Sequence, residues 1–173
     1  MGSAAPGKTD VADSGALTAP GLRSWSPPGG RFTAWQETAL IGTLDDWERI
    51  TGGLSRWEIK TRSGFRVRPA VEVEAGQRPL ILVTLAGLRI REPVEVVQVV
   101  CKTDRVGFSY RALEGHPIRG EEAFIAQLTP RGVELTLRSL TRRAPRGIWR
   151  ILFPGLLVAQ RVARWRYFRA LRY

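Results

Sequence analysis

The apolar residues of this chain follow two periods, and each period predicts a different secondary structure. In residues 43–54 they recur every three or four positions, which is the spacing of one face of an amphipathic helix. Thr43 precedes Asp46 by three residues, as in a capping box with an aspartate in place of the glutamate. We therefore predict a short amphipathic helix that begins at Leu44.

Most of the remaining pattern has a period of two or consists of short apolar runs, and both are typical of strands. Alternation at 57–62 and again at 65–67, interrupted by Ser63 and Gly64, predicts a strand pair or one bulged strand. Further strands are predicted near residues 32–41, in the apolar runs Leu80–Ala86 and Val94–Lys102, in a hairpin across Arg105–Phe124, and at 133–138. These segments make a meander of about six strands.

The predicted hairpin is the most informative stretch of the chain. Its first strand places Phe108 and Tyr110 on one face. The connection from Glu114 to Gly120 is longer than a tight turn and contains His116, the only histidine. We expect this loop to be structured by its own side chains or shaped for a ligand.

The C-terminal part of the chain is predicted to be a basic linker, Thr141–Gly147, followed by a helix. Phe153–Pro154–Gly155 is a break, and a long helix follows it. Small alanines on the inward side let the helix approach the sheet closely, or else leave an apolar pocket between them. The predicted inward positions are Leu156, Ala159, Ala163, Tyr167, Ala170 and Leu171.

Together these elements predict an α+β fold. It consists of an antiparallel curved sheet of about six strands, a short N-terminal helix and a long C-terminal helix packed across the sheet, which is compatible with a helix-grip arrangement. Residues 1–30 are rich in Gly, Ala, Ser and Pro without an apolar period, so they predict a disordered N-terminal tail. Residues 31–173 then form a single α+β domain.

The net charge of +11 is concentrated at the C-terminus, where residues 138–173 contain ten arginines and no acid. Such a basic end is suited to an anionic membrane surface or an acidic partner, and it is also typical of a plain solvated surface. We do not expect nucleic acid as a partner. The candidate docking residues lie on the outer side of the last predicted helix and are Arg161, Trp165, Arg169 and Arg172.

Several classes of site are not expected from this composition. Cys101 is the only cysteine, so no intramolecular disulfide can form. No glycine-rich phosphate loop opens a helix, and no His/Cys/Asp cluster has metal-ligand spacing, so we expect neither a cofactor nor a metal. No apolar run reaches the roughly 18 residues of a membrane span. We expect a cytoplasmic location.

The hairpin also carries a resemblance to a known family. The chain resembles the uncharacterised bacterial and plant proteins catalogued as domain-of-unknown-function family nineteen-ninety, over about Thr43–Tyr173. The resemblance rests on LSRWEIKTRSGFRV, on the FPG and AQ pairs before the last helix, and on the hairpin positions Tyr110, Leu113, Gly115, His116, Pro117, Gly120, Glu121, Glu122 and Phe124. The hairpin departs from the family pattern at Arg111, Ala112, Glu114, Ile118 and Arg119.

No complete catalytic constellation is visible in the sequence. His116 has no adjacent Ser or Cys nucleophile, and Glu121 and Glu122 point to opposite faces of a strand, although one of them can face His116 or Arg142. The sequence is most consistent with a module that binds a small, largely apolar ligand between the sheet and the last helix. Alternatives are an enzyme acting on a ligand near the 110–122 hairpin, and a basic adaptor docking on an anionic membrane or nucleic acid. The candidate pocket residues are Tyr110, His116, Glu121, Arg142, Phe108, Phe124 and Tyr167.

Overall fold

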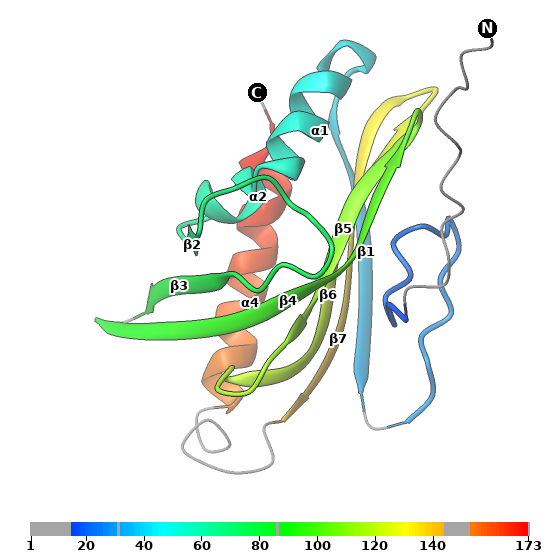
Figure 1. The fold of residues 1–173 in the computed structure, drawn as a ribbon. Helices are drawn as coiled ribbons and strands as arrows, with labels where there is room; N and C mark the ends of the chain where they lie inside the picture. Colours follow the sequence, from blue (N-terminus) through cyan, green and yellow to red (C-terminus); the bar gives the residue numbers. More distant parts are fainter. Residues whose placement is uncertain (1–14, 31, 86, 144–152, 173) are drawn as a thin grey trace, which may run out of the picture.

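The computed structural model describes residues 15–30, 32–85, 87–143 and 153–172 (Figure 1). Among these residues the chain forms, in order, one strand, a group of short helices, six further strands and a long helix. In order, the elements are β1 (Thr33–Gly42), the 3-10 turn η1 (Leu44–Asp46), α1 (Trp47–Ser55), α2 (Glu58–Thr61), β2 (Arg66–Arg68), β3 (Leu80–Leu85), β4 (Leu88–Lys102), β5 (Arg105–Ala112), β6 (Ile118–Thr129), β7 (Gly132–Arg143) and α4 (Phe153–Ala170).

The strands form one antiparallel sheet of seven strands in the order β1-β7-β6-β5-β4-β3-β2. Consecutive strands from β2 to β7 are neighbours, so this part is the predicted meander, and β1 pairs with β7 at the far edge. The expectation of about six strands was one too low. The short helix that we expected at the N-terminus follows β1 and therefore lies between the first two strands.

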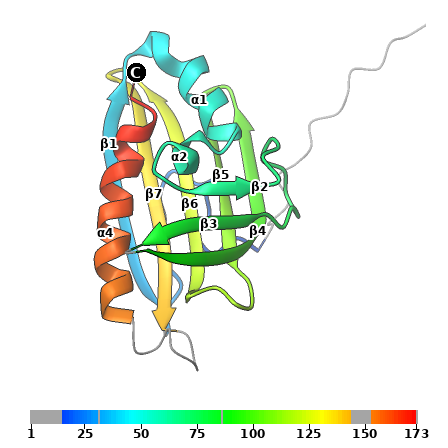
Figure 2. The ribbon, with the colours of Figure 1, turned by 90° about the vertical axis from the view of Figure 1, so that its left-hand side faces the viewer.

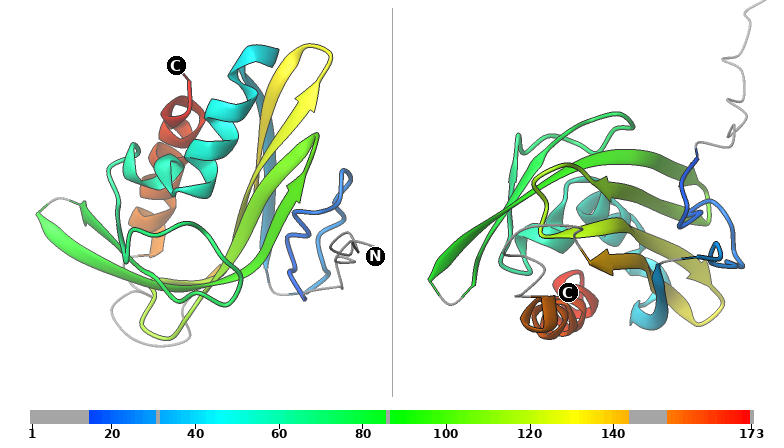
Figure 3. Two further views of the ribbon diagram at one scale, coloured as in Figure 1. Left: turned by 45° about the horizontal axis from the view of Figure 1, so that its top comes forward. Right: turned by 90° about the horizontal axis from the view of Figure 1, so that it is seen from below.

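The sheet curves strongly, and α1, α2 and α4 lie on its concave side (Figures 1 and 2). In Figure 3, β3 and one end of β4 turn away from the other strands, so the sheet wraps around α1, α2 and α4. The register of β4 on β5 shifts between Val96 and Gln98, and such a bulge bends a strand. At Gly120 the φ angle is +150°, and a Cβ there would lie 1.7 Å from the Leu140 carbonyl oxygen, so only glycine fits.

The core lies between the concave face and the helices. Ile50 and Leu54 of α1 are fully buried, because the predicted apolar stripe of that helix faces the sheet. An aromatic cluster fills the centre: the ring centroids of Trp57 and Phe108 are 4.9 Å apart, and those of Phe108 and Phe124 are 5.4 Å apart.

Residues 57–62, which alternation predicted to be a strand, contain the short helix α2 instead. Trp57 takes a left-handed conformation with φ of 61° and redirects the chain, after which Glu58–Thr61 form one helical turn. Ile59 and Lys60 are both buried, whereas a strand would send these neighbours to opposite faces. Packing of both side chains against the concave face therefore overrides the local pattern.

The first α-helix begins later than predicted, and the first residues of the predicted linker belong to a strand. Leu44–Asp46 form a 3-10 turn, and the α-helix begins at Trp47. The capping contact is present, since the backbone N–H of Thr43 donates to the Asp46 carboxylate at 2.8 Å. Residues 141–143 of the predicted linker belong to β7, because they pair with β6. Residues 144–147 lie outside the described part of the chain.

The expected disordered tail is wrong for residues 15–30, which lie against the convex face of the sheet (Figure 1). Thr18 is fully buried, and its backbone N–H donates to the Glu121 carboxylate at 2.8 Å. Arg138, which is 1% exposed, donates to backbone carbonyls of Thr18, Ala19, Leu22 and Arg23. Composition did not predict this docking, because the segment is held mainly through its backbone. Its N–H and carbonyl groups bond to the buried Glu121 and Arg138 side chains of the sheet, whatever the segment's own side chains are. Residues 1–14 lie outside the described residues.

No helix in the described part of the chain is both long enough and apolar enough to span a bilayer.

We predict that Arg138→Met lowers the free energy of unfolding by about 2–3 kcal/mol, because four backbone carbonyls lose the hydrogen bonds of a buried charged donor. Chemical denaturation measures the loss, and limited proteolysis should show earlier cleavage within residues 15–30. The matched control is Arg119→Met, at an exposed position of the neighbouring strand β6, which should change stability by about 0.5 kcal/mol or less. Equal stability of the two variants would contradict the docking role of Arg138.

Candidate functional site

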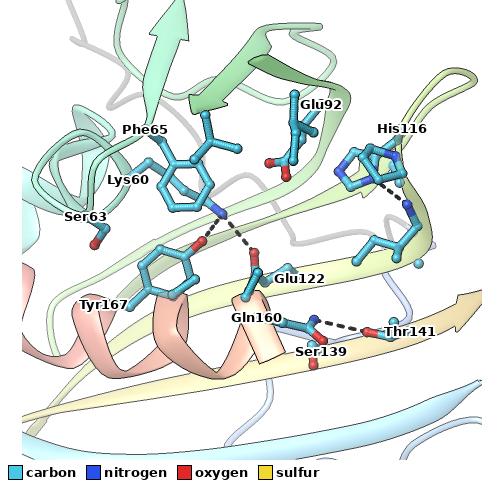
Figure 4. A pocket seen from close by; sticks show the side chains of 18 of the residues that line it. Lys60, Ser63, Phe65, Glu92, His116, Glu122, Ser139, Thr141, Gln160 and Tyr167 are labelled. Carbon is cyan, nitrogen blue, oxygen red and sulfur yellow. Dashed lines mark hydrogen bonds and ion pairs between the residues drawn. The ribbon is translucent and has the colours of Figure 1, made fainter. Parts of the chain in front are cut away.

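A cavity of about 380 Å³ lies between the concave face of the sheet and α4. Its walls come from α2, β3, β4, β5, the 113–117 loop, β6, β7 and α4 (Figure 4). One group of lining residues is apolar or small: Phe65, Val83, Ile90, Ala112, Pro117, Ile118, Gly155, Ala159, Val162 and Ala163. A second group is polar: Lys60, Ser63, Glu92, Tyr110, His116, Glu122, Ser139, Thr141, Gln160, Arg166 and Tyr167.

The cavity exists because α4 has small residues where it passes the middle of the sheet. Gly155, Ala159 and Ala163 line the cavity and cannot reach across to the strands. Towards the C-terminal end of the helix, Tyr167 and Leu171 are buried and fill the space. One end of α4 therefore packs on the core while the other spans an empty volume.

The mouth of the cavity lies between β3 and α4. Thr84 on β3 and Val162 on α4 both line the cavity and are exposed, Val162 by 46%. Figure 2 shows the end of β3 pointing towards α4. The cavity therefore reaches the protein surface at these two residues.

A buried lysine organises the polar end of the cavity. Lys60 of α2 is 2% exposed, and its ammonium group donates to the Glu122 carboxylate at 3.0 Å and to the Tyr167 hydroxyl at 2.6 Å (Figure 4). The Tyr110 hydroxyl donates to the same Glu122 oxygen. Tyr110 and Glu122 are opposite each other in the register of β5 and β6, so the sheet holds them side by side. We call these four residues the lysine cluster.

Aromatic rings surround the Lys60 ammonium group. Its Nζ atom lies 4.5 to 5.1 Å from the ring centroids of Tyr167, Phe65, Tyr110 and Phe124. Each ring presents negative potential to a cation, so the rings and Glu122 together offset the loss of water around the charge.

The charges in the cluster shift the pKa values of its members. Burial raises the pKa of the Glu122 carboxyl, but the Lys60 charge and the hydrogen bonds from Tyr110 and Lys60 outweigh burial and leave it below its ordinary value. Burial, together with the Glu122 charge, raises the pKa values of Tyr110 and Tyr167 well above normal. Glu122 is therefore ionised and both tyrosines are neutral at neutral pH.

Glu92 is a second carboxyl group in the cavity, and it titrates near neutrality. Burial raises its pKa from 4.5 to about 7; the Lys60 charge opposes the rise and the Glu122 charge adds to it. Glu92 lies on β4 two residues from Ile90, so both side chains point to the concave face. No described residue donates a hydrogen bond to this carboxyl group.

His116 lies on the opposite side of the cavity and is neutral. Burial and the nearby Lys60 charge lower its pKa from 6.5 to about 4. The backbone N–H of Ile118 donates to Nδ1 at 3.1 Å, so the proton of the neutral ring is on Nε2. In Figure 4 the Glu92 carboxyl lies between the Lys60 amine and the His116 ring.

Four of the seven predicted pocket residues line the cavity: Tyr110, His116, Glu121 and Tyr167. Glu121 contributes to the wall from the backbone side only, because its carboxylate lies on the convex face and accepts hydrogen bonds from Leu17 and Thr18. The glutamate that faces the cavity is Glu122, and its partners are Lys60 and Tyr110 rather than His116 or Arg142.

The other three predicted pocket residues are not in the cavity wall. Phe108 and Phe124 are 1% and 0% exposed and belong to the core beneath the lysine cluster. Arg142 lies four residues after Arg138 on β7, so both side chains point to the convex face. The Arg142 guanidinium lies 5.1 Å from the ring centroid of Phe32. The sequence analysis placed Arg142 in a linker, and a linker residue cannot be assigned to one face of a sheet.

None of the four predicted docking residues lines the cavity; three lie on the outer side of α4, and Arg172 follows the end of that helix. Trp165 is 56% exposed, and the Arg169 guanidinium lies 3.9 Å from its ring centroid. Arg161 is exposed, and Arg172 donates to the Leu40 carbonyl of β1 at 3.2 Å. A role of this surface in docking remains a prediction.

Sequence analysis missed the two residues that define the polar end, Lys60 and Glu92. Lys60 had been placed on the polar side of a strand, and Glu92 precedes the segment predicted as a strand. One signal was available: among 27 basic residues only three are lysines, and Lys60 is the one inside the motif shared with the family. In the part of the chain that the structure describes, no three His, Cys, Asp or Glu residues form a group that could hold a metal ion.

The family model for Domain of unknown function (DUF1990) matches residues 16–170. The chain belongs to this family. The match begins at residue 16 and so includes the segment docked on the convex face, which the resemblance noted from Thr43 onward did not cover. No curated protein is significantly similar to the sequence.

Solved structures with the same architecture come from several bacteria. A hypothetical protein of Helicobacter pylori (jhp0584) has a TM-score of 0.57 and 10% identity, over 82% of this chain and 85% of that chain. The Zhui aromatase/cyclase of Streptomyces sp. R1128 has a TM-score of 0.53 and 17% identity, over 79% and 91%. A Thermus thermophilus protein, TTHA0849, has a TM-score of 0.52 and 11% identity, over 82% and 94%. At these identities the likeness shows the fold alone, a helix-grip-like fold.

We predict that Lys60→Met destabilises the protein by about 3–5 kcal/mol, because it leaves the Glu122 carboxylate buried without its cation. The double variant Lys60→Met/Glu122→Gln should lose less than the sum of the single variants, as a double-mutant cycle in denaturant will show. Arg131→Met, which breaks the exposed pair with Glu134, is the control and should cost about 0.5 kcal/mol or less. Additive losses would mean that Lys60 and Glu122 do not interact.

We predict that Glu92 makes stability depend on pH relative to Glu92→Gln. The folded-state pKa of about 7 is above the ordinary 4.5, so the folded chain binds a proton more tightly than the unfolded chain. Below pH 4.5 the two proteins should have equal stability. As the pH rises through about 7, the wild type should fall below the variant by roughly 1–3 kcal/mol. A stability difference between the two proteins that is constant across this pH range would contradict the raised pKa of Glu92. The lowered pKa of His116 makes stability rise with pH, but this effect is present in both proteins and cancels in the difference.

Proposed function

We propose that this protein binds a small, largely apolar molecule in the cavity between its sheet and α4. The observation that carries the proposal is the cavity itself: about 380 Å³, walls whose exposed surface is mainly apolar, and a preformed polar cluster at one end. Small-molecule sites combine these features, with volumes of about 300 to 1,000 Å³ and a few polar groups that fix the ligand's orientation.

The polar end supports a binding role because its buried charges add little to the stability of the folded protein. A buried ion pair contributes little net stability, and apolar side chains of the same volume often serve as well. Here the pair of Lys60 and Glu122 adjoins empty space, and Glu92 faces the same space without a hydrogen bond from any described residue. A ligand that fills the cavity would supply the missing contacts.

The shared fold adds limited support. One protein with this architecture is named an aromatase/cyclase, so the architecture is compatible with a site for an organic molecule. At 17% identity, the likeness carries no substrate to this chain.

Catalysis on the bound molecule is a second candidate function, favoured by Glu92. A carboxyl group with a pKa of about 7 is suited to proton transfer at neutral pH, and it faces the cavity beside the Lys60 ammonium group. Under this candidate, Glu92→Gln still binds the molecule but no longer converts it.

We predict that Ala163→Phe blocks ligand binding while the protein stays folded, because the larger side chain projects from α4 into the cavity. A thermal-shift screen of small apolar compounds, followed by native mass spectrometry of the hits, measures binding to both proteins. Wild type should gain roughly 2.7 kcal/mol of stability at a hundredfold excess of ligand over its dissociation constant, and the variant should gain none.

Ala75→Phe is the matched control, because Ala75 is exposed in the β2–β3 connection and outside the cavity wall. It should bind the same compounds as the wild type. A loss of several kcal/mol of stability in Ala163→Phe, together with no hit for the wild type, would show that the cavity closes in solution and would contradict the binding function.

A further inference from the structure

Resting on the proposed binding function, we propose that the ligand is a neutral molecule that carries a hydroxyl group, an alcohol or a phenol. Its hydroxyl hydrogen is donated to Glu92, and its hydroxyl oxygen accepts from Lys60 and Tyr167, whose donor atoms are 2.6 Å apart.

The unpaired acceptor in the cavity is the Glu92 carboxyl. It lies in the cavity wall, and no described residue donates to it, whereas the outward-facing Glu95 of the same strand pairs with Arg78 and Arg111. A carboxyl group removed from bulk water without a partner is unfavourable. A ligand hydrogen atom directed at Glu92 removes that cost.

Three donor hydrogens also remain in the same space. The Lys60 ammonium group has three hydrogens and two acceptors among the described residues, Glu122 and Tyr167. The Tyr167 oxygen accepts from Lys60, so the hydroxyl hydrogen of Tyr167 has no acceptor among the described residues. His116 carries its hydrogen on Nε2, because Nδ1 accepts from the Ile118 N–H, and that hydrogen also has no described acceptor.

The charges around the polar end favour a neutral ligand. The positive charge of Lys60 is matched by Glu122 at 3.0 Å, and His116 is neutral. Glu92 adds at most one negative charge. Arg166 also lines the cavity, but it is exposed and donates to the Ser63 carbonyl at 3.4 Å. At the polar end, an anionic ligand would therefore meet two carboxyl groups, and a cationic one would meet Lys60 within its aromatic rings.

A hydroxyl group is the smallest group that can pair with both the Glu92 acceptor and the Lys60 and Tyr167 donors, because its oxygen donates one hydrogen and accepts two. A ketone or ether oxygen accepts from the donors but leaves the ionised Glu92 carboxylate without a hydrogen-bond donor. A hydrocarbon satisfies neither. The rest of the molecule is apolar, because Ile90, Val83 and Ala163 line the wall beyond the polar end.

The test uses four probes with one ring system: 2-naphthol, 2-methoxynaphthalene, 2-methylnaphthalene and 2-naphthoate. A cavity of about 150 Å³ holds benzene, so two fused rings fit in about 380 Å³. Equilibrium dialysis with the full chain measures each affinity. We expect 2-naphthol to bind about tenfold more tightly than the methyl and methoxy compounds, and 2-naphthoate to bind most weakly.

Two variants assign the preference to Glu92. Glu92→Leu should bind 2-methylnaphthalene like the wild type and should lose most of the preference for 2-naphthol over the methoxy compound. Glu48→Leu, at an exposed position of α1 away from the cavity, should keep the preference.

Each other outcome has one meaning. If the methyl or methoxy compound binds as tightly as 2-naphthol, or if Glu92→Leu keeps the preference, the hydroxyl inference is wrong and the binding function stands. If 2-naphthoate binds most tightly, the ligand is an anion and the inference is wrong. If no probe binds, the proposed binding function itself is contradicted.

Discussion

The interior of this protein depends on one buried ammonium group. Lys60 joins α2 to β6 through Glu122 and to α4 through Tyr167, and Tyr110 of β5 completes the cluster. A charge at this depth is stable only when it is paired and hydrogen-bonded, so the four side chains must keep their relative positions. The cluster therefore sets where α2 and α4 lie on the sheet, and it also forms the floor of the cavity.

The cavity follows from the distribution of side-chain size along α4. Tyr167 and Phe168 in the C-terminal half of the helix, and Leu171 directly after it, lie in the core and anchor the helix. The preceding turns present Ala159 and Ala163 to the strands. Because the curved sheet recedes from a straight helix, the small residues cannot close the gap, and the space remains between them.

Buried charges act differently on the two faces of the sheet. On the convex face, Arg105, Arg138 and Glu121 are satisfied by the backbone of residues 17–23 and by neighbouring side chains. On the concave face, Glu92 has no described partner, and the donors of Tyr167, Lys60 and His116 exceed the acceptors available to them. The three charged groups of the convex face are therefore paired within the protein, whereas the charged groups of the concave face have hydrogen-bonding capacity left for a ligand.

The fold class, the family and most of the strands could be predicted from the sequence, because they depend on local periods and on motifs that are contiguous in the chain. Alternation located β5 and its pairing partner, the Thr43–Asp46 contact marked the first helix, and the alanines of α4 indicated a gap. Three features could not be predicted and depend on long-range contacts: α2 is a helix, residues 15–30 dock on the sheet, and Lys60, Glu92 and Glu122 face the same cavity. Lys60 and Glu122 are 62 residues apart in sequence, and a buried lysine has the same local pattern as a solvated one. What distinguishes them is the set of partners that folding brings together, and no local period encodes that set.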